Sequence, residues 1–262
     1  MRIFEQDGLA THYRVDGDPE GAPVVFANSL GTDLRLWDQV LPLLPRGLKF
    51  IRYDKRGHGL TQAVPAPYSM GALVGDVEKL LDHLGVKDAL FVGLSIGGMI
   101  GQGLAVKRLD LVRAMVISNS AAKIGVPSMW QDRIDAINSG GIEPMADTVM
   151  ERWFGKAFRA TPELAAWRAM LVQQSVAGYT GCSAAISGTD FYTPTSGLRL
   201  PVLGIAGSED GSTPPDLVRE TIDLVPGSRF ELIREAGHLP CVENPKEYAR
   251  ILSEFIKETG HV

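Results

Sequence analysis

Short apolar runs recur along the chain, and stretches with the periodicity of an amphipathic helix separate them. Each run has four or five residues and is rich in β-branched and aromatic side chains, which is typical of strands buried on both faces of a sheet. The runs are Pro23–Ala27, Phe50–Tyr53, Ala89–Val92, Ala114–Ile117 and Val202–Ala206. The helical stretches are Leu34–Leu44, Met70–Leu84, Ile96–Arg108, Pro215–Val225 and Pro245–Lys257. This alternation predicts an α/β fold with a mostly parallel central sheet, helices on both faces and a ligand site at the carboxyl ends of the strands.

Two segments break this alternation. Around the turn Asp7-Gly8, the segments Phe4–Glu5 and Thr11–Val15 alternate polar and apolar residues, which predicts an antiparallel hairpin at a sheet edge. Residues 121–193 contain helical patterns but no buried strand, and the patterns are Ser128–Ser139, Ile142–Phe154, Thr161–Gln174 and Val176–Ser187. Because this segment follows the sixth expected strand, we expect a helical cap over the active-site end, inserted into a core domain of residues 1–120 and 194–262.

Charge and composition restrict the classes of partner. A chain of 262 residues is long enough for one large α/β domain, since single cores stop growing near roughly 250–300 residues. The net charge is −5, with acidic and basic residues interleaved, so no concentrated basic surface is available for nucleic acid. The first residues are charged, and no apolar run approaches the roughly 20 residues that span a bilayer. We therefore expect a cytoplasmic protein without nucleic-acid or membrane partners, acting as a monomer or small homo-oligomer.

The spacing of cysteines and glycines argues against a metal or a nucleotide cofactor. The two cysteines, Cys182 and Cys241, lie far apart and have no CxxC or His-rich partner, so both are expected to be buried thiols. The run Gly93–Gly98 reads GLSIGG and lacks the third-glycine spacing of a dinucleotide fingerprint. We therefore expect no metal and no cofactor.

The same glycine-rich run carries the strongest candidate for chemistry, Ser95. The run joins a predicted buried strand to a predicted helix through a sharp turn. Such a turn needs small residues such as Gly93 and Gly97 beside the serine. The turn lifts the hydroxyl clear of the sheet and points a helix N-terminus at it, which favours developing negative charge. We predict that Ser95 is a nucleophile, and the alternative is a structural serine in a glycine-rich turn.

The general base that a serine nucleophile needs is normally a histidine oriented by a carboxylate. Of the five histidines, His12 in the hairpin, His83 on a helix and His261 at the terminus are expected to face solvent. His238 lies in the loop Glu235–Pro240 after a strand-like segment, and it comes last in the chain order nucleophile, acid, histidine. We predict that His238 is the base.

The acid and the oxyanion donors should lie in loops at the same end of the sheet. The loop after Val202–Ala206 offers Glu209 and Asp210 as the acid. An oxyanion hole needs two backbone N–H groups that face the carbonyl oxygen in its tetrahedral state. Ile96, directly after the nucleophile, supplies one, and Leu30, in the loop after the first buried strand, occupies the expected position of the other.

These motifs carry a resemblance to a known family. The chain resembles the α/β-hydrolase superfamily over essentially its whole length, through Asn28–Thr32 (NSLGT), Asp54–Gly59 (DKRGHG), Gly93–Gly98, Asp210 and Gly237-His238. More narrowly, it resembles the 3-oxoadipate enol-lactonases of the β-ketoadipate pathway, through Asn28–Thr32 followed by Trp37, the DKRGHG turn, Trp130–Ile134 (WQDRI) and Glu151–Phe154 (ERWF). The resemblance implies an α/β-hydrolase fold and a Ser-His-Asp triad.

The resemblance refines the assignments in two loops. The position of Asp210 before Thr213-Pro214 fits the family pattern, which favours it over Glu209 as the acid. In some relatives the acid follows the preceding strand instead, but this chain has Asn119 there, which carries no charge. Many relatives have His-Gly where this chain has Asn28-Ser29, a departure that leaves the backbone donor of that loop available.

The resemblance also implies a substrate and a reaction. The substrate would be an enol-lactone with an acetate side chain, and the product would be 3-oxoadipate. Ser95 would attack the lactone carbonyl, the enol would stay tethered to the acyl group, and water activated by His238 would release the acid while the enol tautomerises. The substrate carboxylate needs a cationic partner, for which Arg133 is the candidate, with Trp130 and Trp153 as pocket walls.

Other interpretations stay open. The alternative for Arg133 is a solvated helix arginine beside two core tryptophans. Arg56 and His58 lie in a turn that is usually structural in this superfamily, and Trp37 either lines the pocket or packs beneath it. The nearest alternative function is a carboxylesterase or lactonase of broader range with the same triad. A receptor-like binder with slow turnover is the alternative from another class.

Overall fold

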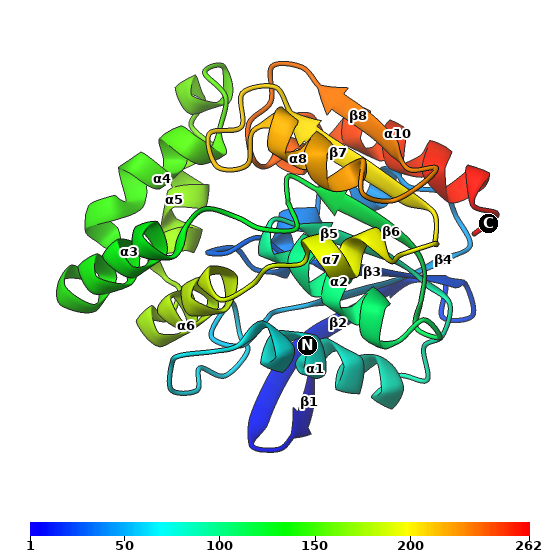
Figure 1. Ribbon diagram of the computed structural model, residues 1–262, viewed down its shortest axis with the longest axis horizontal. Coiled ribbons are helices and arrows are strands. Elements are labelled where there is room, and N and C mark those ends of the chain that lie inside the picture. The colour runs from blue at the N-terminus through cyan, green and yellow to red at the C-terminus, as the bar shows by residue number, and fades with distance from the viewer.

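Eight strands form one sheet in the computed structural model of the protein, which describes residues 1–262 (Figure 1). Their spatial order is β1-β2-β4-β3-β5-β6-β7-β8. The strands are β1 (Arg2–Gln6), β2 (Leu9–Gly17), β3 (Ala22–Ala27), β4 (Leu48–Tyr53), β5 (Ala89–Leu94), β6 (Val112–Ser118), β7 (Val202–Gly207) and β8 (Arg229–Ile233). Strand β2 runs antiparallel to both neighbours, and all other neighbouring pairs are parallel. The mostly parallel sheet and the antiparallel edge hairpin are confirmed.

Helices cover both faces of the sheet. One face carries α1 (Met70–His83), α2 (Ile96–Lys107), α7 (Tyr192–Ser196) and α8 (Pro215–Ile222), which lie in front of the strands in Figure 1. The other carries α9 (Pro240–Glu243) and α10 (Pro245–Glu258), which pack against the 3-10 turns η1 (Leu34–Trp37) and η2 (Leu41–Leu43). The prediction of one helix over Leu34–Leu44 is wrong, because Pro42 has no N–H to continue an α-helical ladder and the chain turns twice instead.

Residues 121–193, which we call the helical segment, leave the sheet between β6 and β7. Their helices are α3 (Pro127–Gly140), η3 (Glu143–Met145), α4 (Ala146–Trp153), η4 (Phe158–Ala160), α5 (Leu164–Val172) and α6 (Val176–Ser187). In Figure 1, α3 to α6 lie together to one side of the sheet. Two predicted helices begin later than expected, since the stretches that hold Pro144 and Pro162 form tighter turns ahead of α4 and α5.

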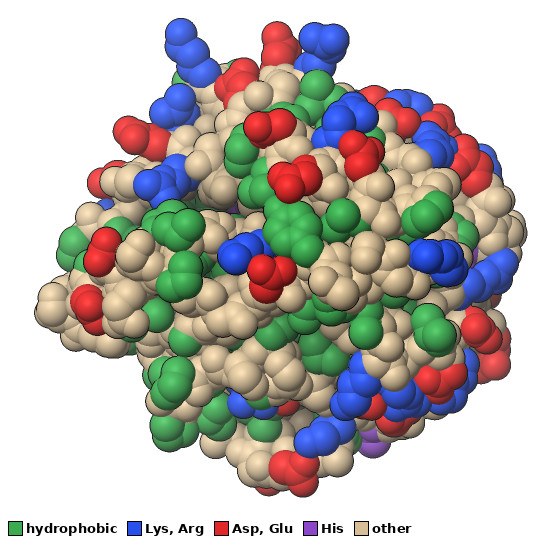
Figure 2. Space-filling view, in the orientation of Figure 1, with side chains coloured by type: hydrophobic (Ala, Val, Ile, Leu, Met, Phe, Trp, Pro, Cys, Tyr) green, Lys and Arg blue, Asp and Glu red, His purple; other side chains and the backbone are tan.

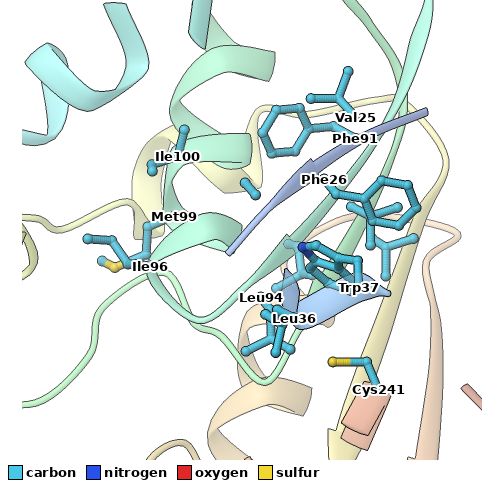
Figure 3. Packing of buried hydrophobic residues seen from close by; sticks show 14 of the residues in the cluster. Val25, Phe26, Leu36, Trp37, Phe91, Leu94, Ile96, Met99, Ile100 and Cys241 are labelled. Atoms are coloured by element: carbon cyan, nitrogen blue, oxygen red, sulfur yellow. The ribbon is translucent and has the colours of Figure 1, made fainter. Parts of the chain in front are cut away.

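Large apolar side chains build the core around β3, β5 and α2 (Figure 3). Phe26 and Trp37 are fully buried, with ring centroids 4.9 Å apart. The indole N–H of Trp37 donates to Asn28 Oδ1 at 2.8 Å, so this side chain packs beneath the site and anchors the loop that follows β3. Cys182 and Cys241 are free and buried, as predicted.

Two of the three histidines expected at the surface are buried, and that prediction is wrong for both. His12 contacts Asp54 Oδ2 through Nδ1 at 2.7 Å, and His261 contacts the carbonyl of Pro23 through Nε2 at 2.8 Å. A polar side chain can be buried once it has a partner, and these partners lie far away along the chain. Only His83 is exposed, and its ring stacks on Phe4.

Charged side chains of both signs are interspersed on the face that Figure 2 shows. Arg108 illustrates the pattern, because it forms ion pairs with Glu78, Asp82 and Asp110. Surface pairs of this kind contribute little to the stability of a fold. None of the helices combines the length and the apolar character needed to cross a bilayer.

Candidate functional site

Ser95 lies at the sharp turn between β5 and α2. Its backbone has φ 57° and ψ −123°, a left-handed conformation that side-chain-bearing residues rarely adopt. The turn is held by hydrogen bonds on both sides, from Ser95 N–H to Ser118 O at 2.9 Å and from Ser120 Oγ to Ser95 O at 2.6 Å. Strand β6 therefore fixes the strained residue at the end of β5.

Glycines allow this turn to be so tight. A Cβ added at Gly93 would lie 2.3 Å from Gly97 O, and one added at Gly97 would lie 2.2 Å from Ala27 O. Backbone atoms cannot give way to such contacts, so residues with a side chain are excluded at both positions. The first turn of α2 consequently packs directly against the carboxyl end of β3, next to the loop that holds Leu30.

His238 and Asp210 form a buried pair at the neighbouring strand ends. His238 Nδ1 lies 2.8 Å from Asp210 Oδ2, and their side chains are 2% and 0% exposed. Burial alone would raise the pKa of Asp210, but His238 and hydrogen bonds from Asn119 and Thr213 outweigh it and hold this pKa below its usual value. The carboxylate therefore stays ionised, and it can orient the imidazole and stabilise its protonated form.

The neighbouring residues Glu209 and Asn119 have different contacts. Glu209 Oε2 accepts the N–H of Lys156 at 2.9 Å, so this carboxylate faces the helical segment. Asn119, which carries no charge, donates from Nδ2 to Asp210 Oδ2 at 2.9 Å. Asp210 is thus the carboxylate in contact with His238, and Asn119 supports it from the adjacent strand end.

The other ring nitrogen of His238 faces the pocket. Ser29 Oγ lies 3.4 Å from His238 Nε2, and Ser95 Oγ makes no hydrogen bond to it in this structure. Ser95 and His238 nevertheless line the same pocket. Hydrogen bonds between a nucleophile and its base are often long until substrate is bound.

Two backbone N–H groups beside Ser95 are free. Neither Leu30 N–H nor Ile96 N–H donates to any acceptor within the protein. By contrast, the next donor in the loop, Gly31 N–H, is bound by His58 Nε2 at 3.0 Å. Free, rigid N–H groups at the pocket wall are what a tetrahedral oxyanion requires.

The pocket has a volume of about 320 Å³, which suits a small molecule. The structure brings together there the residues predicted from sequence, namely Ser95, His238, Leu30, Trp130, Arg133 and Trp153. Among the lining residues that sequence reasoning missed are Arg152 and Tyr179. Arg152 directly precedes the predicted wall residue Trp153 in the ERWF motif, and that place in the motif was an available signal.

Two arginines of the pocket wall have no acidic partner. Neither Arg133 nor Arg152 forms an ion pair with Asp or Glu, while Arg133 Cζ lies 5.0 Å from the Trp130 ring centroid. Burial raises the pKa of Tyr179, and both guanidiniums act against that rise, which places the two positive charges near its hydroxyl. The part of the pocket wall that holds these arginines is therefore cationic and suited to an anionic group.

Glu243 joins the helical segment to the loop of His238. Its carboxylate accepts the N–H of Gly155 at 2.8 Å and the N–H of Gly237 at 2.6 Å. Burial raises the pKa of Glu243 to about 7, with Glu209 and Asp210 adding to the rise. This carboxyl group is consequently protonated more readily in the folded chain than in the unfolded chain.

Replacing Glu243 with glutamine should change how stability depends on pH. Because the pKa is raised on folding, the native state holds an extra proton between about pH 4.5 and 7, and the stability that Glu243 contributes is lost as pH rises through this window. Urea unfolding at pH 5 and pH 8 measures it, and the wild type should lose on the order of 2 kcal/mol relative to E243Q. Parallel stability curves for the two proteins would contradict the raised pKa.

Comparisons with known proteins give the family of the chain. The profile described as Alpha/beta hydrolase family matches residues 24–251. The 3-oxoadipate enol-lactonase 2 of Acinetobacter baylyi is 33% identical over 251 residues, which cover 95% of this chain and 94% of that protein. The crystal structure of the enol-lactonase from Burkholderia xenovorans LB400 has 32% identity and a TM-score of 0.94, covering 98% of this chain and 100% of that one. A hydrolase from Pseudomonas aeruginosa PA01 has 34% identity and a TM-score of 0.93, covering 97% of each chain.

The family match extends from β3 to α10, and these residues include most of the eight-stranded sheet. On this basis the chain belongs to the α/β hydrolase family.

Proposed function

We propose that the protein is a serine hydrolase that opens the ring of 3-oxoadipate enol-lactone to give 3-oxoadipate, a step of aromatic catabolism. The observation that carries this proposal is the pairing of Ser95 with two unpaired arginines, Arg133 and Arg152, in one small pocket. A lactone with a carboxylate side chain offers its carbonyl carbon as the electrophile for Ser95 and its carboxylate as the anion for the two arginines. The names of the enol-lactonase relatives support the same substrate.

In the first half-reaction, Ser95 Oγ attacks the lactone carbonyl and His238 Nε2 accepts its proton. Asp210 stabilises the imidazolium through Nδ1, and the N–H groups of Leu30 and Ile96 bind the oxyanion. The C–O bond of the ring breaks, and the enolate takes the proton from His238. An enolate is a better leaving group than an alkoxide, so general acid catalysis has less to supply here.

In the second half-reaction, water attacks the acyl-enzyme. His238 removes a proton from the water, the same two N–H groups bind the second oxyanion, and the bond to Ser95 Oγ breaks as the proton returns to it. The freed enol tautomerises to the ketone. The overall reaction is a hydrolysis, and it needs no redox step and no cofactor.

The helical segment supplies the specificity in this proposal. It acts as a cap of residues 121–193 over a core of residues 1–120 and 194–262, and it contributes Trp130, Arg133 and Trp153 to the pocket. The Trp130 ring lies against the Arg133 guanidinium and limits its rotamers. The arginine is therefore held ready for the substrate carboxylate, at little entropic cost on binding.

Kinetics with a matched pair of substrates test the proposal. Replacing Arg133 or Arg152 with methionine should raise KM for the anionic lactone by about 10- to 100-fold, since a hydrogen bond to a charged group is worth about 1.5–3 kcal/mol. The KM for a neutral methyl ester of the same lactone should change little. Steady-state kinetics on both substrates measure the difference.

Arg159 provides the matched control. It lies in the helical segment, is exposed and forms no ion pair, but it lines a different cavity. Its methionine variant should keep wild-type constants for both substrates. If the wild type hydrolyses the neutral ester as well as the anionic lactone, the broader carboxylesterase function replaces the proposed one.

A further inference from the structure

Lys55 is a buried lysine beside the loop of Leu30. It lies in the turn after β4, is 3% exposed and forms no ion pair with a carboxylate. Its Nζ donates to Ser29 O at 2.5 Å and to Thr32 O at 3.2 Å. A buried ammonium costs free energy unless its surroundings compensate for lost hydration, and here its two hydrogen bonds go to carbonyl groups of this loop.

The carbonyl that Lys55 binds belongs to the peptide group of a free pocket donor. Ser29 C=O and Leu30 N–H are the two ends of one planar amide and point in opposite directions. Ser29 O also accepts Thr32 Oγ1 at 3.0 Å and Thr32 N–H at 3.3 Å, so the oxygen end is held on several sides. With the oxygen end fixed toward Lys55, the Leu30 N–H is directed away from it.

The other side of Leu30 is fixed as well. Gly31 N–H donates to His58 Nε2 at 3.0 Å, which requires that nitrogen to be unprotonated. Burial and the neighbouring charge of Lys55 lower the pKa of His58 well below its usual value, so it remains an acceptor. Lys55 and His58 of one turn thus hold the peptide groups on both sides of Leu30.

We propose that Lys55 is a positioning residue of the oxyanion hole, whose ammonium group orients and polarises the Ser29–Leu30 amide so that its N–H stabilises the tetrahedral oxyanion. The proposal rests on the proposed function, in which Leu30 N–H is an oxyanion donor. A positive charge at the oxygen end of an amide withdraws electron density and strengthens its N–H as a donor. The effect grows with the charge on the substrate oxygen, so it acts on the transition state more than on bound substrate.

The protonation of Lys55 links this device to pH. Burial lowers the pKa of Lys55 to about 8, against the opposing influence of Asp33, Asp54 and Cys182. Burial also raises the pKa of the Cys182 thiol to about 12, so that group stays neutral, and the two carboxylates are bound to Arg35 and His12. Above pH 8 the ammonium loses its proton and the amide loses its polarising charge, so kcat should fall along an alkaline limb.

Two substitutions at Lys55 separate charge from hydrogen bonding. K55M removes both, and K55Q keeps an N–H donor for the Ser29 carbonyl without the charge. We expect K55M to lower kcat for p-nitrophenyl acetate at least about tenfold, since loss of a whole oxyanion donor costs about 100- to 1000-fold. The kcat of K55Q should lie between those of K55M and the wild type. KM should stay unchanged, because an interaction made only in the transition state lowers kcat and kcat/KM equally.

A boronic acid provides a readout that a purely structural role would not move. A small alkyl boronic acid forms a tetrahedral adduct on the nucleophile and places an oxygen in the oxyanion hole, so its affinity should fall by the same factor as kcat. The matched control is R56Q, which alters the adjacent cation. Arg56 pairs with Asp76 and packs on Tyr68 without touching the loop, so its loss should lower the melting temperature and leave kcat and boronate affinity near wild type.

The outcomes distinguish this inference from the proposed function. If the wild type hydrolyses neither esters nor lactones, the proposed function fails and the role of Lys55 fails with it. If the wild type is active while K55M keeps its kcat and boronate affinity, only the role of Lys55 is overturned. Should K55M not fold, K55Q decides, and a K55Q variant that keeps wild-type kcat and boronate affinity overturns the inference.

Discussion

Replacing Ser95 with alanine is expected to lower kcat for ester or lactone hydrolysis by about a million-fold, as loss of the nucleophile does in other serine hydrolases. Alanine has the same backbone requirements as serine at φ 57°, and the hydrogen bonds that hold the turn use only the Ser95 backbone. The fold should therefore survive, and circular dichroism with thermal melting checks it. Steady-state kinetics measure the loss, and a fluorophosphonate probe should label the wild type but not S95A.

Ser29 makes this test sharper. Its hydroxyl, not that of Ser95, is the one within 3.4 Å of His238 Nε2. If Ser29 only contacts the base, S29A keeps covalent labelling at Ser95 and most of the activity. Labelling that persists in S95A and disappears in S29A would contradict the assignment of the nucleophile.

Much of the fold followed from local patterns, and the errors have local causes. Buried strands such as Ala89–Leu94 stand out because both faces are apolar, and the period of helices such as α10 is equally clear. The apolar period over Leu34–Leu44 is that of a helix. Pro42 has no N–H for an α-helical ladder, however, so the chain forms two short 3-10 turns there, which the period alone does not reveal. Buried histidines escaped prediction for another reason, since His12 depends on Asp54, which lies 42 residues further along the chain.

The candidate site likewise contains residues that local sequence reveals and residues that it does not. Ser95 and the turn around it are encoded within a few residues, so sequence alone singles them out as candidates. Asn119 and Lys55 are not identifiable in this way, because their partners lie 91 and 26 residues away along the chain. Their importance arises only when the sheet aligns the ends of β3, β4, β6 and β7.

Backbone contacts also connect the pocket wall to the catalytic loops. Trp153 O accepts the N–H of His238 at 2.7 Å and that of Leu239 at 3.3 Å, and Arg152 O accepts the N–H of Gly211 at 3.2 Å. The pocket wall that carries Arg152 and Trp153 is thus attached directly to the loops of His238 and Asp210, the proposed base and acid. Substitutions that displace α4 should therefore affect kcat together with KM.

Replacing Asp210 with asparagine should lower kcat by about 10,000-fold with little loss of fold, as the equivalent change does in another serine hydrolase. Asp210 Oδ1 accepts the N–H groups of Ser212 and Thr213, while Oδ2 faces His238 Nδ1. In the variant the amide oxygen stays with the two backbone donors, and the NH₂ group then faces Nδ1. That nitrogen must become an acceptor, which moves the proton of His238 to Nε2 and prevents it from acting as a base.

Glu209 supplies the matched control, because it is the neighbouring carboxylate and was the other candidate for the acid. E209Q removes one charge from the same loop but leaves the Asp210–His238 contact intact, so its kcat should stay within a few-fold of wild type. Kinetics at pH 7 and the imidazole N–H signals of His238 in proton NMR measure both effects. Near-normal turnover in D210N with a large loss in E209Q would make Glu209 the acid instead of Asp210. The Glu209 carboxylate, which faces the helical segment in this structure, would then have to reach His238 during the reaction.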